Sequence, residues 1–206
     1  LKESSVPETL ATEVTRALRG VEDKMGRHLG DPSDPLLVSV RSGAKFSMPG
    51  MMETVLNIGL NDKSVLGLAA VSGNERFAWD SYRRLIQMFG KTVLDIDGDL
   101  FSDALDDLKA ERGVKGDTEL TAEDLKGLVD TFKGIVKEQT GADFPQDPRT
   151  QMDMGIEAVF RSWNTERARI YRRRERIPHN LGTAVNICTM VFGNMGENSG
   201  TGVCFT

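Results

Sequence analysis

Leu36-Leu-Val-Ser-Val40 runs directly into Arg41-Ser-Gly-Ala-Lys-Phe-Ser-Met-Pro-Gly-Met-Met52, and this junction organises the interpretation of the whole chain. The first string is short, apolar and partly β-branched, and no other β-rich run precedes residue 180, so it predicts a buried strand. The second string has neither helical nor strand periodicity and contains glycine and proline, which predicts a loop. A strand that ends at Arg41 would deliver a guanidinium to the mouth of that loop.

The predicted loop has a composition suited to binding an anion. Ser42, Gly43, Ser47 and Gly50 are small, so backbone N–H groups can approach an anion closely, and Arg41 supplies a charge that binds phosphate in bidentate fashion. An ordinary surface loop anchored by the same arginine is the alternative. The glycine spacing of a Walker loop is absent. Composition alone leaves both interpretations open.

Helices are predicted on both sides of this junction. Residues 7–28 carry apolar side chains at helical spacing, and Asp31-Pro-Ser-Asp-Pro35 ends that helix. Almost all of residues 64–174 is helical by the same criterion, and its clearest helix begins at Thr121, where Asp124 stands in the capping-box position. The fold class expected is therefore α+β.

Strand character returns in the last thirty residues. Residues 183–192 alternate in polarity, residues 193–200 are rich in turn formers, and residues 201–205 are again β-rich, which predicts a hairpin. We expect this hairpin to form a sheet with the 36–40 strand. The stretch from 64 to 174 should then be a mainly helical block separate from that sheet.

The composition excludes several classes of protein. The chain has 206 residues, 39% hydrophobic and 28% charged, which fits one globular domain and argues against disorder. No apolar run approaches the roughly 20 residues that cross a bilayer, and no secretory signal is visible at the start. A net charge of −5 argues against nucleic-acid binding.

The cysteines and the chain ends carry two further expectations. Cys188 and Cys204 match no disulfide framework or zinc spacing, so reduced thiols in the cytoplasm are expected. The chain starts on Leu1 and closes on an apolar β-rich run, which favours a piece of a larger protein over a small complete domain.

Seven arginines lie between Arg161 and Arg176. A nucleic-acid interface would need more aromatic residues than Trp163 and Tyr171 and a basic domain around them. A solvated helix face paired with carboxylates is one interpretation of this run. Contact of one or two arginines with phosphate is the other, and Arg161 and Arg167 are the members that we expect to reach a cleft.

Methionines gather at two places, at Met48, Met51 and Met52 in the predicted loop and at Met190 near the end of the late strand. Methionine is usually core filler, but in a loop it can also cover the flat face of a bound base. The run Asp95-Ile-Asp-Gly-Asp-Leu100 departs from the EF-hand pattern, so an acidic helix cap is expected there, and no metal site is assigned.

Nine strings carry a resemblance to a known family: Pro35-Leu-Leu-Val-Ser-Val-Arg-Ser-Gly-Ala44, Ser47-Met-Pro-Gly-Met-Met-Glu-Thr54, Asn57-Ile-Gly-Leu-Asn-Asp62, Asp80-Ser-Tyr-Arg-Arg-Leu-Ile-Gln-Met-Phe89, residues 120–125, Val159-Phe-Arg-Ser-Trp163, Gly182-Thr-Ala-Val-Asn186, Met190-Val-Phe-Gly-Asn194 and Ser199-Gly-Thr-Gly202. In this order they resemble the pyruvate, phosphate dikinase family, from about residue 34 to the end. The resemblance implies part of an ATP-grasp-like nucleotide-binding domain with a large helical insertion. Residues 1–62 would form its first part, 63–178 the insertion and 179–206 the hairpin.

The resemblance also assigns a nucleotide site. Arg41 falls on a phosphate-contacting arginine, residues 47–52 fall on a flexible phosphate loop, and residues 183–192 are similar to a strand that lines the nucleotide cleft. The nucleotide- and phosphate-binding residues expected from it are Arg41, Ser42, Ser47, Met48, Gly50, Met51, Met52 and Met190. Cys188 stands where the family usually has glutamine.

The family enzyme moves the β-phosphoryl group of ATP to a histidine on a separate domain and releases AMP. A second half-reaction uses phosphate and pyruvate and ends in phosphoenolpyruvate, with diphosphate as the other product. The resemblance therefore implies ATP as substrate, Mg²⁺ as cofactor, and a phosphohistidine domain and a pyruvate-binding domain as partners within a homodimeric, cytoplasmic parent enzyme. It implies no nucleic acid and no membrane.

The lysine segment, the acidic metal ligands and the acceptor histidine of the family do not fall within this chain, so we expect the chain alone to be inactive. A related dikinase such as phosphoenolpyruvate synthase is one alternative. A non-catalytic module that uses its helical insertion as an interaction surface is the other.

Overall fold

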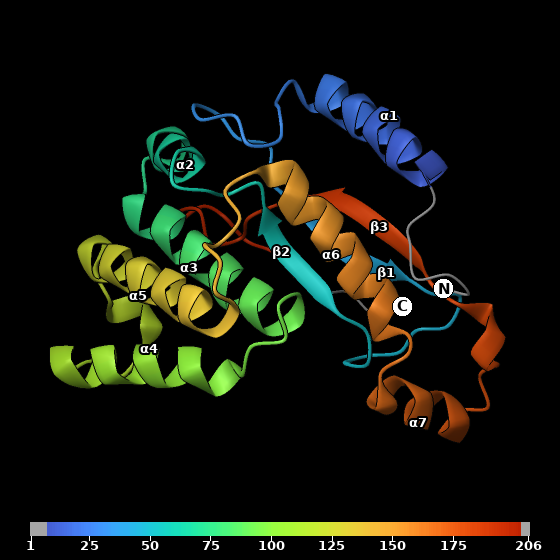
Figure 1. Cartoon of the computed structure of the whole chain (residues 1–206). Helices are drawn as coiled ribbons and strands as arrows, with labels where there is room; N and C mark the ends of the chain where they lie inside the picture. Colours follow the sequence, from blue (N-terminus) through green and yellow to red (C-terminus); the bar gives the residue numbers. More distant parts are fainter. Residues whose placement is uncertain (1–7, 203–206) are drawn as a thin grey trace.

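Residues 8–202, the part of the chain that the computed structural model describes, contain seven α-helices, two single-turn 3₁₀ helices and three strands. The α-helices are α1 (Glu8–Met25), α2 (Ser64–Ser72), α3 (Glu75–Thr92), α4 (Gly98–Arg112), α5 (Ala122–Thr140), α6 (Pro148–Ser162) and α7 (Glu166–Arg174). The strands are β1 (Val38–Gly43), β2 (Thr54–Ile58) and β3 (Ala184–Thr189), and the 3₁₀ helices are η1 (Asp117–Glu119) and η2 (His179–Leu181). This mixture confirms the α+β class (Figure 1).

The sheet has the order β2-β1-β3, and β1 is antiparallel to both neighbours. The β1–β3 pairing runs from Val38 opposite Thr189 to Gly43 opposite Ala184, so the early and late strands do form one sheet, as the sequence predicts. Two expectations about the early part are wrong. The strand continues to Gly43, which places Arg41 inside it and not at its end, and β2 is a second strand before residue 180.

The predicted hairpin is replaced by a different arrangement after β3. Residues 190–202 contain no strand, so Thr201 and Gly202 do not return as predicted, and the remainder of that expected strand lies outside the described residues. The segment instead folds back onto α3. The Nδ2 of Asn74 donates to the carbonyl of Met195 at 3.1 Å, and the rings of Phe77 and Phe192 meet edge to face with centroids 5.0 Å apart.

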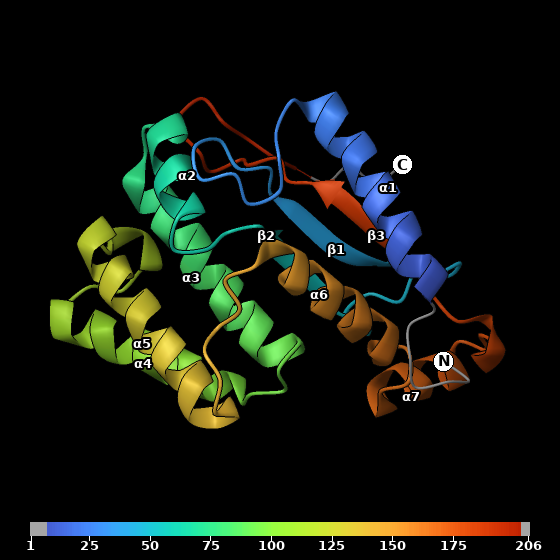
Figure 2. The same ribbon diagram turned by 45° about the horizontal axis from the view of Figure 1, so that its top comes forward.

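One face of the sheet is covered by helices (Figure 2). Helix α6 packs on β1 and β2, where Gly155 allows the close approach, because a Cβ there would lie 3.1 Å from the Cδ1 of Ile58. The apolar side of α1 faces Val185 and Ile187 of β3 across a small apolar groove. Helix α3 borders the free edge of β2, where the backbone N–H of Leu56 donates to the Sδ of Met88 at 3.3 Å.

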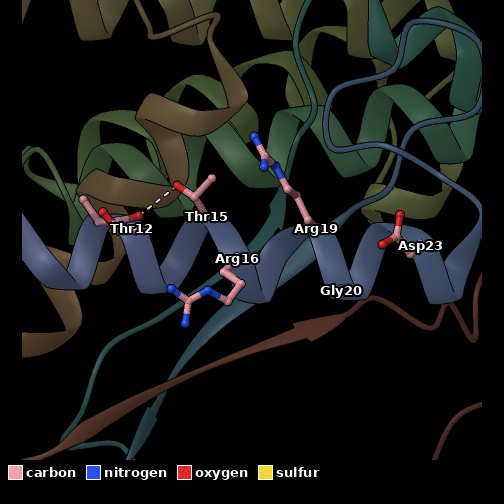
Figure 3. Close-up of a pocket in the computed structure, with 7 residues that line it drawn as sticks. Thr12, Thr15, Arg16, Arg19, Gly20 and Asp23 are labelled. Atoms are coloured by element: carbon pink, nitrogen blue, oxygen red, sulfur yellow. Dashed lines mark hydrogen bonds between the residues drawn. The ribbon is translucent and has the colours of Figure 1, made fainter.

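The outer side of α1 borders a shallow hollow of about 700 Å³ (Figure 3). All of the residues that line this hollow come from α1, and the side chains of Arg16 and Arg19 extend to opposite sides of the helix. The guanidinium of Arg149 on α6 donates to the Oγ1 of Thr15 at 2.7 Å and so ties α1 to the helix that covers the sheet.

The stretch from 64 to 174 is helical, as the sequence predicts, and its capping box is present. The backbone N–H of Asp124 donates to the Oγ1 of Thr121 at 3.2 Å, and the N–H of Thr121 donates to the Asp124 carboxylate at 3.0 Å. One continuous apolar core nevertheless runs from the sheet into this helical stretch. The division of the chain into 1–62, 63–178 and 179–206 stays a prediction.

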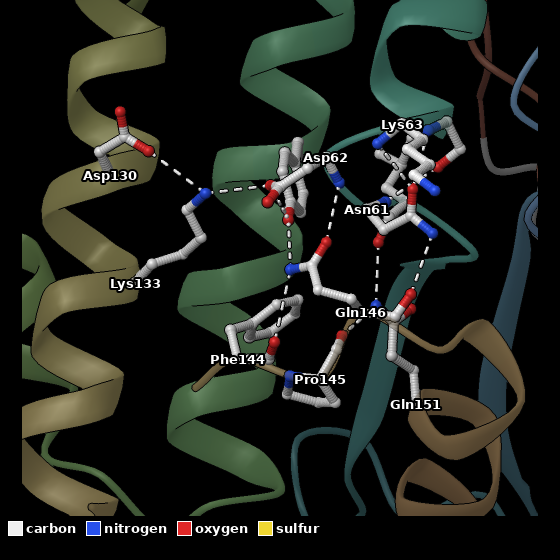
Figure 4. Close-up of polar contacts among 12 residues, drawn as sticks. Asn61, Asp62, Lys63, Asp130, Lys133, Phe144, Pro145, Gln146 and Gln151 are labelled. Carbon is white, nitrogen blue, oxygen red and sulfur yellow. Dashed lines mark hydrogen bonds and ion pairs between the residues drawn. The ribbon is translucent and has the colours of Figure 1, made fainter. Parts of the chain in front are cut away.

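A buried polar network joins the end of β2 to the helical stretch (Figure 4). The Oε1 of Gln151 accepts from the N–H of Gly59 at 3.1 Å, and its Nε2 donates to the carbonyls of Leu60 and Pro145 at 2.9 and 2.8 Å. The hydroxyl of Tyr82 donates to the carboxylate of Asp62 at 2.9 Å, and burial raises the pKa of that hydroxyl. These bonds fix the chain as it leaves the sheet.

Candidate functional site

The face of the sheet away from α6 is buried at Ser39 but open toward the Gly43 end of β1, where it carries a row of polar side chains. Arg41 on β1 lies opposite Thr54 of β2 and opposite Asn186 of β3. Directly opposed residues of antiparallel strands share one face, so the three form a line across the sheet. Arg41 and Asn186 are both exposed. The structure thus presents a guanidinium between a hydroxyl and an amide on an open surface.

The opposite face alternates with this one along the same strands. Val38 and Val40 point to the helices and are fully buried. The side chain of Ser42 lies on the same face as these valines, and therefore on the face opposite to Arg41. Ser42 is opposite Val185. The structure therefore separates Ser42 from Arg41, although the two are neighbours in the sequence.

The loop between β1 and β2 is held from one side by its methionines. Met48 is 6% exposed and belongs to a buried cluster with Trp163, Ala168 and Ile177. Met51 and Met52 pack against the same cluster. These side chains serve as anchors of the loop here, so the sequence-based idea that they cover a bound base receives no support from their packing.

The exposed residues of the loop are Lys45, Phe46, Ser47, Pro49 and Gly50. Gly50 has φ of +72°, a left-handed conformation that glycine adopts without strain, and a Cβ added there would meet nothing within 4 Å. The N–H of Met51 donates to the carbonyl of Met48 at 3.1 Å and closes a tight turn. Residues 44–47 connect this turn to the end of β1 at Gly43, which lies two residues beyond Arg41.

Arg167 and Arg161 occupy different positions relative to this loop. Arg167 on α7 forms an ion pair with Glu53, the residue that follows the loop, and it lines a groove of about 580 Å³ together with Gly50 and Met52. The guanidinium of Arg161 on α6 instead donates to the carbonyl of Val93 at 3.0 Å. The structure brings Arg167 to the loop and gives Arg161 a bond to the end of α3.

Met190 lies at the far end of the sheet from the loop. Its backbone N–H donates to the carbonyl of Leu37 at 2.9 Å, before the start of β1, while the loop begins after Gly43 at the other end. At about 3.3 Å per strand residue, roughly 20 Å separates the two places. Met190 and the loop methionines therefore do not form one cluster.

The groove beside the loop includes residues that the sequence analysis did not single out. Asn57 and Arg83 are 6% and 3% exposed, and the Oδ1 of Asn57 and the Nε of Arg83 lack hydrogen-bond partners. Arg83 is paired with Asp80 in the buried stripe of α3. The sequence did contain a signal for this buried pair. Asp80 and Arg83 lie three residues apart within an apolar stripe, and charged residues are seldom buried unless paired.

The described residues do not fit a magnesium site of their own. Within residues 8–202, no group of three or more His, Cys, Asp or Glu side chains converges as a metal ion would require. Cys188 is exposed on β3, on the same face as Asn186. In the described part of the chain, no helix combines the length and apolar character that a membrane span requires.

Comparison with known proteins gives a consistent set of matches. A family described as pyruvate phosphate dikinase, AMP/ATP-binding domain, matches residues 1–206. The pyruvate, phosphate dikinase of Giardia intestinalis is 55% identical over 205 residues, which are 100% of this chain and 23% of that protein. That of Clostridium symbiosum is 52% identical over 98% of this chain and 23% of its own length. The chloroplastic enzyme of Flaveria pringlei is 55% identical over 98% of this chain and 21% of its length. The chain spans less than a quarter of these relatives.

Proposed function

The chain belongs to the pyruvate phosphate dikinase AMP/ATP-binding domain family, and from that premise we propose that the open face of its sheet, with the loop beside it, binds the phosphates of ATP. The observation that carries the proposal is the row of Thr54, Arg41 and Asn186 on that face. An arginine with hydrogen-bonding neighbours on both sides is suited to hold phosphate oxygens in a fixed geometry. The family match confirms the resemblance found in the sequence.

The residues of this chain would contribute binding and electrostatic stabilisation. Arg41 would bind the terminal phosphates and stabilise the charge that develops on them during transfer. The backbone of residues 47–52 would cover the same phosphates. Its N–H donors would include those of Ser47 and Gly50, since Pro49 has no N–H and that of Met51 already donates to Met48. Arg167 could join them if its pair with Glu53 opens. The base would extend along the sheet toward Met190.

The wider reaction is part of the proposal. The protein that contains this chain would transfer the β-phosphoryl group of ATP to a histidine on another domain and interconvert pyruvate, phosphate and ATP with phosphoenolpyruvate, AMP and diphosphate. Mg²⁺ would arrive with ATP, and its protein ligands would come from beyond this chain. An ATP-grasp-like fold, a homodimeric parent and a cytoplasmic location complete the proposal.

The direct test uses the full-length protein that contains this chain. ATP labelled in the β-phosphate is added with Mg²⁺, and acid-labile label on the protein is measured over time. Arg41→Met should slow labelling about 10²- to 10³-fold, the usual effect of removing one preorganised charge contact. Arg19→Met is the matched control and should label at the normal rate. Arg19 is an exposed arginine on α1, the helix that lies on the opposite, covered face of the sheet.

Two outcomes would reject the proposal. Normal labelling of Arg41→Met would remove this arginine from the site, and no labelling of the unsubstituted protein would favour a non-catalytic interaction module. Product analysis with and without inorganic phosphate distinguishes the related dikinase. Diphosphate that forms only when phosphate is supplied supports the proposed reaction, whereas phosphoenolpyruvate formed without added phosphate indicates phosphoenolpyruvate synthase.

A further inference from the structure

Arg172 on α7 is a buried cation without a carboxylate partner among the described residues. It is 1% exposed. Its Nη1 donates to the carbonyl of Trp163 at 2.6 Å, its Nε donates to the Nδ1 of His179 at 3.1 Å, and its guanidinium stacks on the Trp163 indole 4.0 Å from the ring centroid. Burial, and to a lesser extent the neighbouring Arg169, lowers the pKa of this guanidinium.

Such an arrangement is costly, because a buried charge without a counter-charge loses its hydration and regains it only in part from hydrogen bonds. In this structure, the buried guanidinium of Arg172 makes three separate contacts that offset part of this cost. All three act on the segment from Trp163 to His179, which leaves α6, forms α7 and returns to η2. Arg172 therefore fixes both ends of this segment against each other.

That segment is the support of the loop between β1 and β2. Trp163, Ala168 and Ile177 form one buried cluster with Met48, and Met51 and Met52 pack against it. Apart from these contacts, the loop has an internal bond at the turn of residues 48–51 and an ion pair between Glu53 and Arg167 of α7. One further tie comes from the end of α6, where the Oγ of Ser162 accepts from the N–H of Glu53 at 3.2 Å.

We propose that Arg172 is a positioning residue for phosphoryl transfer, which acts through Trp163 and Met48 to hold the 47–52 loop over the phosphates. The inference rests on the proposed function of that loop. Arg172 itself does not touch the nucleotide. Its removal would let Trp163 tilt, release Met48 and leave the loop backbone in many positions, of which few cover a phosphate.

The experiment compares four variants of the full-length protein: Arg172→Met, Met48→Ala, the double variant, and Arg173→Met as a control from the exposed side of the same helix. Two properties are measured for each variant. The first is kcat and KM for labelling by ATP. The second is tryptic cleavage after Lys45, an exposed residue just before the loop, with and without MgATP. Cleavage is followed by the appearance of a new N-terminus at Phe46.

Arg172→Met should lower kcat at least tenfold with the KM for ATP within threefold, because the loop acts on the reacting phosphates. Cleavage after Lys45 should become at least fivefold faster and lose its protection by MgATP. Met48→Ala should behave in the same way, and the double variant should be no more than twofold worse than either single variant, since both changes break one chain of contacts. Arg173→Met should match the unsubstituted protein.

A purely structural role would lower the melting temperature but leave kcat per folded molecule and the protection of Lys45 unchanged, and that result overturns the proposal. Multiplying effects of the two substitutions overturn it as well. If Arg172→Met does not fold, Arg172→Lys keeps the charge but loses the planar stack. It should still speed cleavage at least fivefold, and normal cleavage in this variant overturns the proposal. Arg41→Met separates the two hypotheses. Normal labelling by Arg41→Met would reject the phosphate site itself. Slow labelling by Arg41→Met, together with normal labelling and cleavage in the Arg172 variants, would reject only the role of Arg172.

Discussion

The two faces of the same three strands differ in almost every physical property. The face under α6 and α1 is built from Val38, Val40, Val55 and Ile58, all fully buried. The other face buries Ser39 but presents Arg41, Asn186 and Cys188 to solvent. Because successive residues of a strand alternate in direction, one short sequence supplies both a core and a polar surface. We infer that substitutions on the first face act on stability and those on the second act on ligand binding.

The largest expected effect is on the covered face. Ile58→Ala should destabilise the chain by about 4 kcal/mol, because truncation of a fully buried isoleucine leaves a cavity between the sheet and α6. Asn186→Ala, on the open face, is the matched control and should change stability by less than about 0.5 kcal/mol. Urea unfolding of the 206-residue chain measures both. Equal losses from the two variants would contradict the division between faces.

The next effect concerns the network where β2 meets the helical stretch. Gln151→Met keeps the volume but leaves the N–H of Gly59 and the carbonyls of Leu60 and Pro145 without their partner. Unsatisfied buried groups of this kind cost about 1–3 kcal/mol each, so a loss of about 3 kcal/mol is expected by the same unfolding measurement. Gln139→Met, at an exposed position near the end of α5, is the control and should change stability by less than about 0.5 kcal/mol. A neutral Gln151→Met would show that water replaces the lost bonds.

A smaller effect tests the close approach of α6 to the sheet. Gly155→Val adds side-chain atoms where a Cβ alone lies 3.1 Å from Ile58, so overpacking should cost about 2 kcal/mol. Gly127→Val, within α5, has nothing within 4 Å of the added Cβ and should be neutral or slightly stabilising. Thermal melting of the pair separates packing from helix propensity. Equal melting temperatures would mean that α6 shifts away from the sheet without cost.

The smallest effect on stability is expected at Cys188. Cys188→Gln lies on the open face, so the free energy of unfolding should change by less than about 0.5 kcal/mol. Its amide would stand beside the row of Arg41 and Asn186, and the KM for ATP should therefore change while the melting temperature does not. Titration of the labelling rate with ATP gives the KM. A shift in melting temperature at constant KM would place Cys188 in the packing and not in the site.

The sequence allowed the helices and one sheet pairing to be predicted, because these depend on local periodicity. The helix that begins after Thr121 carries its own start signal, and β1 and β3 are β-rich. Strand β2 was missed because Thr54-Val-Leu-Asn-Ile58 is short and contains Asn57 in a left-handed conformation. Only pairing with β1 explains its strand geometry, and pairing is not a local property.

The candidate site was predictable only in part. Arg41 and the 47–52 loop follow from composition and family resemblance, and their meeting at one phosphate site stays a prediction, because the groove lined by Gly50 and Met52 does not include Arg41. The separation of Ser42 from Arg41 depends on the strand reaching Gly43, which the sequence did not indicate. The support of the loop by Trp163 and Arg172 joins residues more than 100 positions apart, and no local pattern contains that information.

The central claim is that ATP lies on the open face of the sheet and under the loop beside it. Hydrogen–deuterium exchange of the full-length protein, with and without a non-hydrolysable ATP analogue and Mg²⁺, tests it most directly. The account predicts slower exchange at the backbone amides of residues 47–52 and along β3, with no change in α4. Protection confined to the helices α3 to α5, with unchanged exchange in the 47–52 loop, would contradict it.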